Sequence, residues 1–473
     1  MPTESLSDRQ LAELAAVENR LLERFRDRLI VNHDLDRTLV SAQANRSEHV
    51  DRWFKYREGF SAPLMRYLLQ RLEVTQGRLL DPFAGSGTAV FAASAAGLDT
   101  TGIELLPSSI EILEVRKLVH DAPSSSWAAR LQAFCQARSW EQPGPVRPIS
   151  HLPISAGAYA ADVEHALGRF LYETEQTDDP RLARVLRFAA LCVLEAISYT
   201  RKDGQYLRWD YRATRPRRGH FDKGTILSFS QAITLKLQEM VADLVRISDT
   251  GAVPQRGQID IRAGSALQIV PRFAQGTFDA LITSPPYCNR YDYTRTYALE
   301  LAFLGVNAAR LKQLRQEMLS CTVENRSKTG LDRQFSSDGY HLARRAFESQ
   351  ECLQGILQYL DQARRRKTLN NSGIPRMVHN YFLELTILFA DCARILKAGS
   401  PCVIVNDNVR YHGAHVPVDL ILSDLAEKVG FTAEAIWVLP KGKGNSSQQM
   451  AAHGRSELRK SVYVWRANRA PEP

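Results

Sequence analysis

The chain has 473 residues, about three times the usual domain size of roughly 150, so two or three structural regions are expected. Hydrophobic residues make up 44% and charged residues 24%, which excludes a disordered, collagen-like or low-complexity chain. A net charge of +9 favours a polyanion such as nucleic acid as the first partner to consider.

Cysteine usage and hydropathy favour a cytoplasmic protein. The seven cysteines form no CxxC pair and show no metal-ligand spacing with histidine, so neither a disulfide framework nor a metal site is expected. The N-terminal segment has acidic residues and a helical apolar period, which is not the pattern of a signal peptide. No apolar run approaches the roughly 20 residues of a membrane span, and we expect no membrane partner.

The apolar spacing over residues 5–30 predicts a helix, in a brace covering residues 1–48. From Gly77 the pattern predicts a short strand, a glycine turn, an alanine-rich helix and a second strand that ends at Glu104. This is a βαβ unit. Turn-forming residues at 121–127 and 141–148 mark a boundary after it.

Two helical inserts are predicted, at 121–256 and 301–379. Between them, strand patterns return near residue 259 and stop abruptly at a Ser-Pro-Pro turn, and further strands and helices follow in 380–467. Alternating strands and helices predict an α/β sheet core, built from residues 49–120, 257–300 and 380–467.

The turn DPFAGSGT at 81–88 lies between a predicted strand and helix, where small residues let backbone N–H groups approach a ligand. Gly85 and Gly87 alone could equally serve a tight turn. Glu104, however, closes the next strand 17 positions after Gly87, where a carboxylate can bind the two hydroxyls of a ribose. Without the lysine of a triphosphate-binding loop, this pattern favours a nucleoside cofactor with a short tail.

The second motif is TSPPY at 283–287, after the predicted strand FDALIT. Two prolines remove backbone donors and leave carbonyls exposed at the carboxyl end of the sheet. Ser284 and the Pro285 carbonyl can accept hydrogen bonds from an amino group, and the Tyr287 ring can stack on an extruded base. The alternative is a rigid turn with a packed tyrosine.

Together, DPFAGSGT, TGIELLP and FDALITSPPY resemble the amino-group class of S-adenosylmethionine-dependent DNA methyltransferases. Segments 53–69 and 261–270 and the strands of 380–467 are similar to further family segments, although Ser265 stands where the family often has an acid. The resemblance implies a Rossmann-like methyltransferase sheet with helices on both faces, plus mostly helical inserted regions.

The resemblance also implies a site. Asp81 and the backbone from Ala84 to Gly87 would hold the methionine moiety, and Glu104 the ribose. The full implied cofactor set is Phe60, Ser61, Pro63, Asp81, Pro82, Phe83, Ala84, Gly85, Gly87, Thr88, Glu104 and Ser265. The implied catalytic residues are Ser284, Pro285, Pro286 and Tyr287.

The implied reaction moves a methyl group from S-adenosylmethionine to the exocyclic amino group of a flipped base in double-stranded DNA, without a covalent enzyme intermediate. Serine before Pro-Pro resembles the cytosine-N4 group more than the adenine-N6 group. Adenine-N6 methylation, RNA base methylation and a non-catalytic DNA-binding protein remain alternatives. A restriction-modification or related defence system, with a cognate restriction endonuclease, is the implied setting.

Two basic segments are candidate DNA contacts. Residues 201–224 carry eight Lys/Arg against three Asp, with interleaved aromatic residues that can stack on bases; the expected contacts are Arg201, Lys202, Tyr206, Arg208, Trp209, Arg212, Arg215, Arg217 and Arg218. Arg364, Arg365 and Arg366 form a second candidate, as a phosphate clamp. Solvated charge is the alternative for both.

A cytosine-C5 methyltransferase would need a cysteine nucleophile, and Pro401-Cys402 is the only Pro-Cys pair. Cys402 begins an apolar strand, and Cys288 directly follows Tyr287. We predict that both are core thiols.

Overall fold

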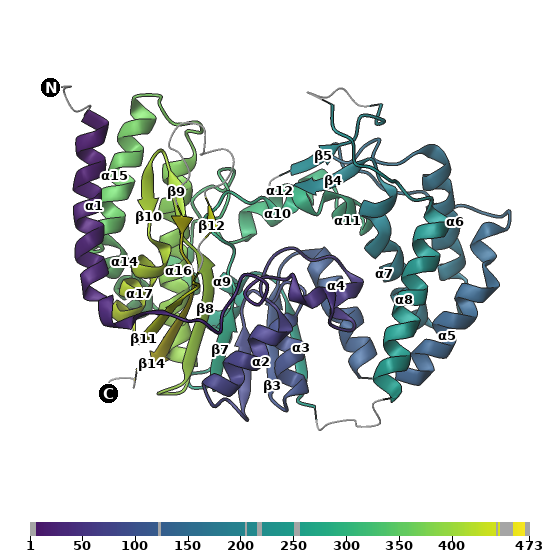
Figure 1. Ribbon diagram of the computed structural model, residues 1–473, viewed down its shortest axis with the longest axis horizontal. Helices are drawn as coiled ribbons and strands as arrows, with labels where there is room; N and C mark the ends of the chain where they lie inside the picture. Colours follow the sequence, from purple (N-terminus) through teal and green to yellow (C-terminus); the bar gives the residue numbers. More distant parts are fainter. Residues whose placement is uncertain are drawn as a thin grey trace.

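The computed structural model describes residues 6–121, 124–203, 206–214, 220–249, 256–440, 443–444 and 457–468. Its centre is an eight-stranded sheet in the order β1-β11-β14-β8-β7-β2-β3-β6 (Figure 1). The strands are β1 (Leu29–Val31), β2 (Arg78–Asp81), β3 (Asp99–Glu104), β6 (Ile259–Ala263), β7 (Ala280–Thr283), β8 (Pro401–Asp407), β11 (Phe431–Val438) and β14 (Lys460–Ala467). Only β14 runs antiparallel to its neighbours in this sheet.

Helices cover both faces of the sheet because successive strand side chains point to opposite sides. On one face, Leu79 and Val403 pack with α2 (Ala62–Arg71) and α3 (Thr88–Ala95). On the other, Leu80 and Ile404 pack with α9 (Ala266–Ile269), α16 (Ile374–Ile395) and α17 (Val418–Lys428). The predicted α/β fold of the Rossmann-like type is confirmed, and so is the βαβ unit from β2 through α3 to β3.

The N-terminal region is more than a brace. Helix α1 (Leu6–Arg24) packs on α15 (Glu351–Arg365), and Arg24 forms ion pairs with Asp424 and Glu427 of α17. Beyond α1, however, β1 pairs with β11 and extends the sheet. A three-residue strand with Ile30 and Val31 half-exposed has too little periodicity to be found from sequence.

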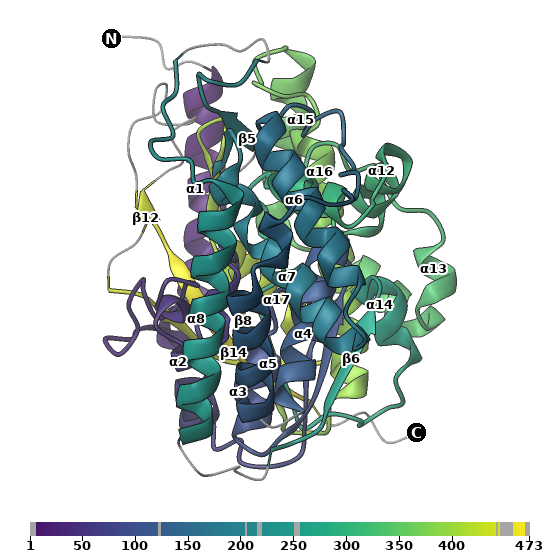
Figure 2. The ribbon, with the colours of Figure 1, turned by 90° about the vertical axis from the view of Figure 1, so that its right-hand side faces the viewer.

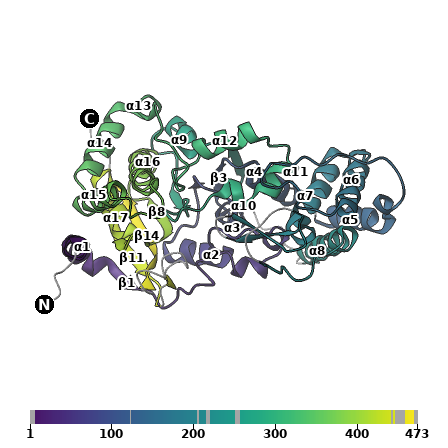
Figure 3. The same cartoon turned by 90° about the horizontal axis from the view of Figure 1, so that it is seen from above.

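The described residues of the first predicted insert (124–203, 206–214 and 220–249) form most of a helical unit around a second hydrophobic core, at the right of Figure 1. Its helices are α5 (Ser124–Ala137), α6 (Ala161–Glu175), α7 (Pro180–Ile197) and α8 (Phe229–Asp249). A hairpin of β4 (Thr200–Asp203) and β5 (Tyr206–Trp209) projects from it. Helix α4 (Pro107–His120) and helix α11 (Ala298–Phe303) contribute to this core and join it to the sheet. Seen from above, the unit lies at the opposite end of the molecule from α1 (Figure 3).

The remaining elements lie mostly around the carboxyl end of the sheet. They are α10 (Tyr293–Thr296), α12 (Ala308–Glu317), α13 (Leu331–Gln334), α14 (Ser337–Glu348), and the short strands β9 (Val409–Tyr411), β10 (Ala414–Val416), β12 (Lys443–Gly444) and β13 (Glu457–Leu458). Helices α14 and α15 pack on α16 and share its core, so the second insert is not a separate unit. Within the described ranges, the helices are too short or too polar to cross a membrane.

Candidate active site

A cavity of about 510 Å³ lies at the carboxyl ends of β2, β3, β7 and β8. Its wall combines the turn after β2, Glu104 at the end of β3, the Ser284–Tyr287 turn after β7 and Asp407 at the end of β8. Ligands of open α/β sheets bind at this edge, and the volume suits a small organic molecule. The fold therefore brings both sequence motifs into one cavity.

The glycine turn is shaped by packing on both sides. Gly87 ends the turn before α3 with φ +84°, and a Cβ there would lie 2.5 Å from Leu113 Cδ2. Gly85 lines the cavity with φ +54°, and a Cβ there would lie 3.0 Å from the Tyr56 ring. Gly87 is thus required by the fold, whereas Gly85 keeps the backbone open beside the cavity.

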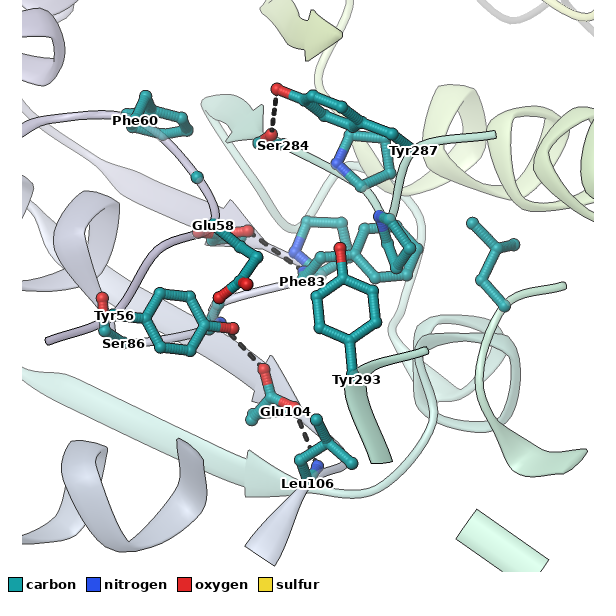
Figure 4. Close-up of a pocket in the computed structure, with 18 of the residues that line it drawn as sticks. Tyr56, Glu58, Phe60, Phe83, Ser86, Glu104, Leu106, Ser284, Tyr287 and Tyr293 are labelled. Atoms are coloured by element: carbon teal, nitrogen blue, oxygen red, sulfur yellow. Dashed lines mark hydrogen bonds between the residues drawn. The ribbon is translucent and has the colours of Figure 1, made fainter. Parts of the chain in front are cut away.

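Glu104 is held in place by three backbone N–H groups. Its Oε2 accepts a hydrogen bond from Gly85 N at 2.8 Å, and its Oε1 accepts from Leu105 N and Leu106 N, each at 2.8 Å (Figure 4). Burial nevertheless raises the pKa of the carboxyl to about 7. The group is therefore fixed in orientation but only partly ionised at neutral pH.

Asp81, at the end of β2, is a second buried carboxylate. Its Oδ1 accepts hydrogen bonds from Phe83 N at 3.0 Å and from Thr283 Oγ1 at 2.6 Å. Burial raises its pKa to about 6, despite both hydrogen bonds. The Thr283 hydroxyl thus joins the end of β2 to the end of β7, directly before Ser284.

The Ser284 hydroxyl lies 3.1 Å from the Val405 carbonyl oxygen and 3.1 Å from the Tyr287 hydroxyl (Figure 4). A hydroxyl carries a single proton, so donation to Val405 leaves the Ser284 oxygen free to accept. Pro285 and Pro286 line the same wall. The turn therefore lines the cavity with the Ser284 oxygen available as an acceptor, and its binding of an amino group stays a prediction.

The structure separates the predicted cofactor residues into two groups. Lining the cavity are Phe60, Asp81, Pro82, Phe83, Ala84, Gly85, Thr88, Glu104 and Ser265. The Ser61 side chain instead caps α2, accepting from Leu64 N at 3.2 Å and donating to Leu39 O at 2.6 Å. Pro63 lies in the first turn of α2, and Gly87 packs against Leu113. These three residues shape the neighbouring backbone and do not line the cavity.

An aromatic wall around Glu58, not predicted from the sequence, forms one side of the cavity. The Glu58 carboxylate accepts hydrogen bonds from the Tyr291 and Tyr297 hydroxyls. Tyr56 stacks on Tyr297 with ring centres 5.5 Å apart, and Figure 4 shows Tyr56, Glu58 and Tyr293 around the cavity. The run of tyrosines after the Ser-Pro-Pro turn was the available signal. Asp407 and Lys460 also line the cavity and were missed.

Only part of the first basic segment lies at the surface as expected. Arg201 is exposed on β4, and Arg208 is half-exposed with its guanidinium 4.2 Å from the ring centre of Phe221. Trp209 packs partly against the core of the helical unit. The Tyr206 side chain and Arg215, Arg217 and Arg218 lie outside the described residues.

Lys202 and Arg212 are engaged within the protein. The Lys202 side chain is 2% exposed, with its ammonium 2.6 Å from Glu300 and 4.5 Å from the ring centre of Tyr297. Arg212 pairs with the buried Asp210 at 2.6 Å. The expectation that Lys202 contacts DNA is therefore wrong, because its ammonium is buried and already paired with the Glu300 carboxylate. Arg212 keeps a third of its side chain exposed.

In the second basic segment, Arg364 and Arg365 pair with Asp361 at 2.6 and 2.8 Å, and Arg366 is exposed at the end of α15. Figures 1 and 2 show that this end of α15 and the β4–β5 hairpin lie at the same end of the molecule. The carboxyl edge of the sheet also faces that end.

Cys288 and Cys402 are fully buried core residues, as predicted. Burial raises the pKa of both thiols well above the ordinary value. Neither provides the thiolate nucleophile that a cytosine-C5 mechanism needs.

A mostly parallel sheet with one antiparallel strand and a cavity at its carboxyl edge is the arrangement expected of the Rossmann-like methyltransferase class. Comparisons with known proteins agree. The chain is 48% identical over 465 residues to the type II methyltransferase M.AvaI of Nostoc sp. (strain PCC 7120 / SAG 25.82 / UTEX 2576), covering 97% of this chain and 95% of that protein. M.AvaI of Anabaena variabilis gives the same values.

A third relative, the type II methyltransferase M.BsoBI of Geobacillus stearothermophilus, is 37% identical over 455 residues, covering 91% of this chain and 88% of its own. Neither a family model nor a solved structure matches the chain. Identity of this extent over nearly the whole length shows that the chain belongs to the type II methyltransferases. The similarity extends through both helical inserts.

Proposed function

We propose that the protein is a site-specific DNA methyltransferase of a restriction-modification system, which transfers a methyl group from S-adenosylmethionine to N4 of an extruded cytosine. One observation carries the proposal: the Glu104 carboxylate and the Ser284–Tyr287 turn, which the sequence resemblance assigns to the ribose and to the target amino group, line one cavity. The family membership supports methyl transfer. The net charge of +9 supports a nucleic-acid substrate.

The residues present fit S-adenosylmethionine. Glu104 is oriented to accept from the ribose hydroxyls, and the open backbone at Gly85 lets the cofactor approach closely. Burial raises the pKa of the Asp81 carboxyl and so disfavours its ionised form. A cationic ligand nearby would stabilise the carboxylate, so the site favours a ligand that carries positive charge. When bound, the cofactor supplies the electrophilic methyl group.

Ser284, Pro285 and Tyr287 act on the base. The Ser284 oxygen and the Pro285 carbonyl accept from the target amino group, which draws the nitrogen lone pair out of conjugation with the ring. The Tyr287 ring stacks on the base and fixes its plane. Positioning of the amino nitrogen in line with the methyl group supplies much of the rate, and no enzyme nucleophile is needed.

We propose cytosine as the target base, and not adenine, because a serine before Pro-Pro resembles the cytosine-N4 group of the family. We test this by expressing the protein in a host without DNA methylation and measuring modified nucleosides by mass spectrometry. The expected product is N4-methylcytosine, absent from cells that express a Ser284→Ala, Tyr287→Ala double variant. Detection of N6-methyladenine instead would support an amino-methyltransferase but would show that its target base is adenine and not cytosine. If no modified base exceeds the level in cells that express the double variant, DNA is not the substrate under these conditions, and RNA is the next substrate to test.

The exposed arginines of the β4–β5 hairpin are proposed to bind DNA phosphates. Replacing Arg201 and Arg208 with glutamine is expected to weaken DNA binding and to reduce the slope of log affinity against log salt by about 2. Fluorescence anisotropy over a salt series measures both. Arg26, an exposed arginine two residues after the C-terminal end of α1, provides the matched control. Its replacement by glutamine should leave the slope unchanged. An unchanged slope in the Arg201, Arg208 double variant would show that the hairpin arginines do not contact DNA phosphates.

A further inference from the structure

Lys460 places a cation beside the base-binding turn. It opens β14 directly opposite Asp407 of β8, and its Nζ lies 3.3 Å from Asp407 Oδ1. The same Nζ lies 5.5 Å from the ring centre of Tyr287, and all three residues line the cavity. Because Ser284 contacts the Tyr287 hydroxyl, one tyrosine ring lies within reach of both an amino-group acceptor and an ammonium donor.

The Lys460 ammonium keeps its charge in this setting. Burial lowers its pKa, but the Tyr287 hydroxyl and the Asp407 carboxylate raise it more, so the pKa lies above the ordinary value. The ammonium carries three donors, and Asp407 is a single carboxylate partner at one side. A base that enters the cavity displaces water from the remaining donors and must offer an acceptor in return.

Cytosine and adenine differ in what they offer. Both carry an amino group next to a ring nitrogen that accepts. Cytosine then has a carbonyl oxygen, O2, on the same edge, whereas adenine has a C2–H group there. With its amino group at Ser284, a cytosine stacked on Tyr287 has two acceptors left for the ammonium, and adenine has one.

We propose that Lys460, held by Asp407, donates a hydrogen bond to O2 of the extruded cytosine and is thereby the residue that selects cytosine over adenine. The inference rests on the proposed function and names the feature of the base that the site reads.

The test combines a substitution of Lys460 with a change in the target base, so that the effect of each can be measured in the presence of the other. A duplex carrying the site mapped in the expression host is prepared with cytosine, or with a 2-aminopyridine C-nucleoside that keeps the amino group and ring nitrogen but lacks O2. Single-turnover methyl transfer is measured at alkaline pH with wild type, Lys460→Met and Lys397→Met. Lys397 forms an ion pair with Asp279 at 2.5 Å, at the opposite end of β7 and at a more exposed position, and serves as the control for loss of a lysine that does not line the cavity.

We expect loss of O2 to slow wild type and Lys397→Met by about 10- to 100-fold, and Lys460→Met by about threefold or less. Unchanged S-adenosylmethionine affinity in Lys460→Met would show that the cavity is intact. Equal sensitivity of Lys460→Met and wild type to loss of O2 would overturn the proposal. If wild type methylates adenine, the amino-methyltransferase function stands and the Lys460 inference fails; if it methylates no base, both fail.

Discussion

Replacing Ser284 with alanine is expected to lower the single-turnover rate of methyl transfer by about 100- to 1,000-fold, equivalent to about 2.7–4 kcal/mol of transition-state stabilisation. The Ser284 proton is directed to the Val405 carbonyl at 3.1 Å, so its oxygen is a preorganised acceptor for the target amino group. Removing it leaves the amino lone pair conjugated with the ring. Rapid-quench kinetics with labelled cofactor measures the rate.

The affinity for S-adenosylmethionine should not change in Ser284→Ala, because Glu104 and Asp81 are untouched. Ser400→Ala is the matched control, since Ser400 precedes β8 at the opposite edge of the sheet. A rate within threefold of wild type in Ser284→Ala would remove Ser284 from the reaction. A parallel loss of cofactor affinity would assign it a structural role.

Replacing Glu104 with glutamine is expected to weaken S-adenosylmethionine binding by about 2–3 kcal/mol, a factor of roughly 30–150. Glutamine retains the size of the side chain but offers only one oxygen acceptor and no charge. Calorimetric titration measures the affinity. Glu58→Gln, a second carboxylate that lines the cavity but accepts from tyrosine hydroxyls, is the control that separates loss of the ribose contact from general disturbance of the cavity.

The same variant tests a pH dependence. In the unliganded protein, burial holds the pKa of Glu104 at about 7, above its ordinary value of 4.5. Ionisation of this group therefore opposes folding as pH rises from about 4.5 to 7, whereas the ribose hydroxyls favour the ionised form. Wild type should bind the cofactor about tenfold more tightly at pH 8 than at pH 6. Glu104→Gln should lose most of that difference, and retention of it would assign the titration to another group.

The βαβ unit and both motifs were predictable because each is a local pattern. A strand, a turn and a helix follow one another between Gly77 and Glu104, and the Ser-Pro-Pro turn ends a strand. In a parallel sheet the carboxyl ends of such strands meet at one edge. The proximity of Glu104 and Ser284 in one cavity therefore follows from two separate stretches of sequence.

Residues brought to the cavity by distant pairing were not predictable. Lys460 reaches it only through the register of β14 on β8, which places it opposite Asp407. Glu58 precedes α2 and meets tyrosines from a segment more than 200 positions away. No periodicity within a single sequence encodes such contacts.

The composition of a segment does not show which of its charged residues lie at the surface. Lys202 stands in a strongly basic segment, but its partner Glu300 lies on α11 and buries it. The Ser61 hydroxyl is a similar case, because the cap it forms on α2 involves Leu39, 22 positions earlier. A basic or polar residue contributes to a surface or a site only when the fold leaves it uncommitted.

The most direct test of the central claim uses purified protein, unmethylated duplex DNA and S-adenosylmethionine labelled with deuterium in its methyl group. The DNA is hydrolysed after the reaction, and the nucleosides are identified by mass spectrometry. The expected result is the labelled methyl group on N4 of cytosine, with about 1% or less of that amount transferred by Ser284→Ala in the time of one wild-type turnover. Label on C5 of cytosine, or on no base at all, would contradict it.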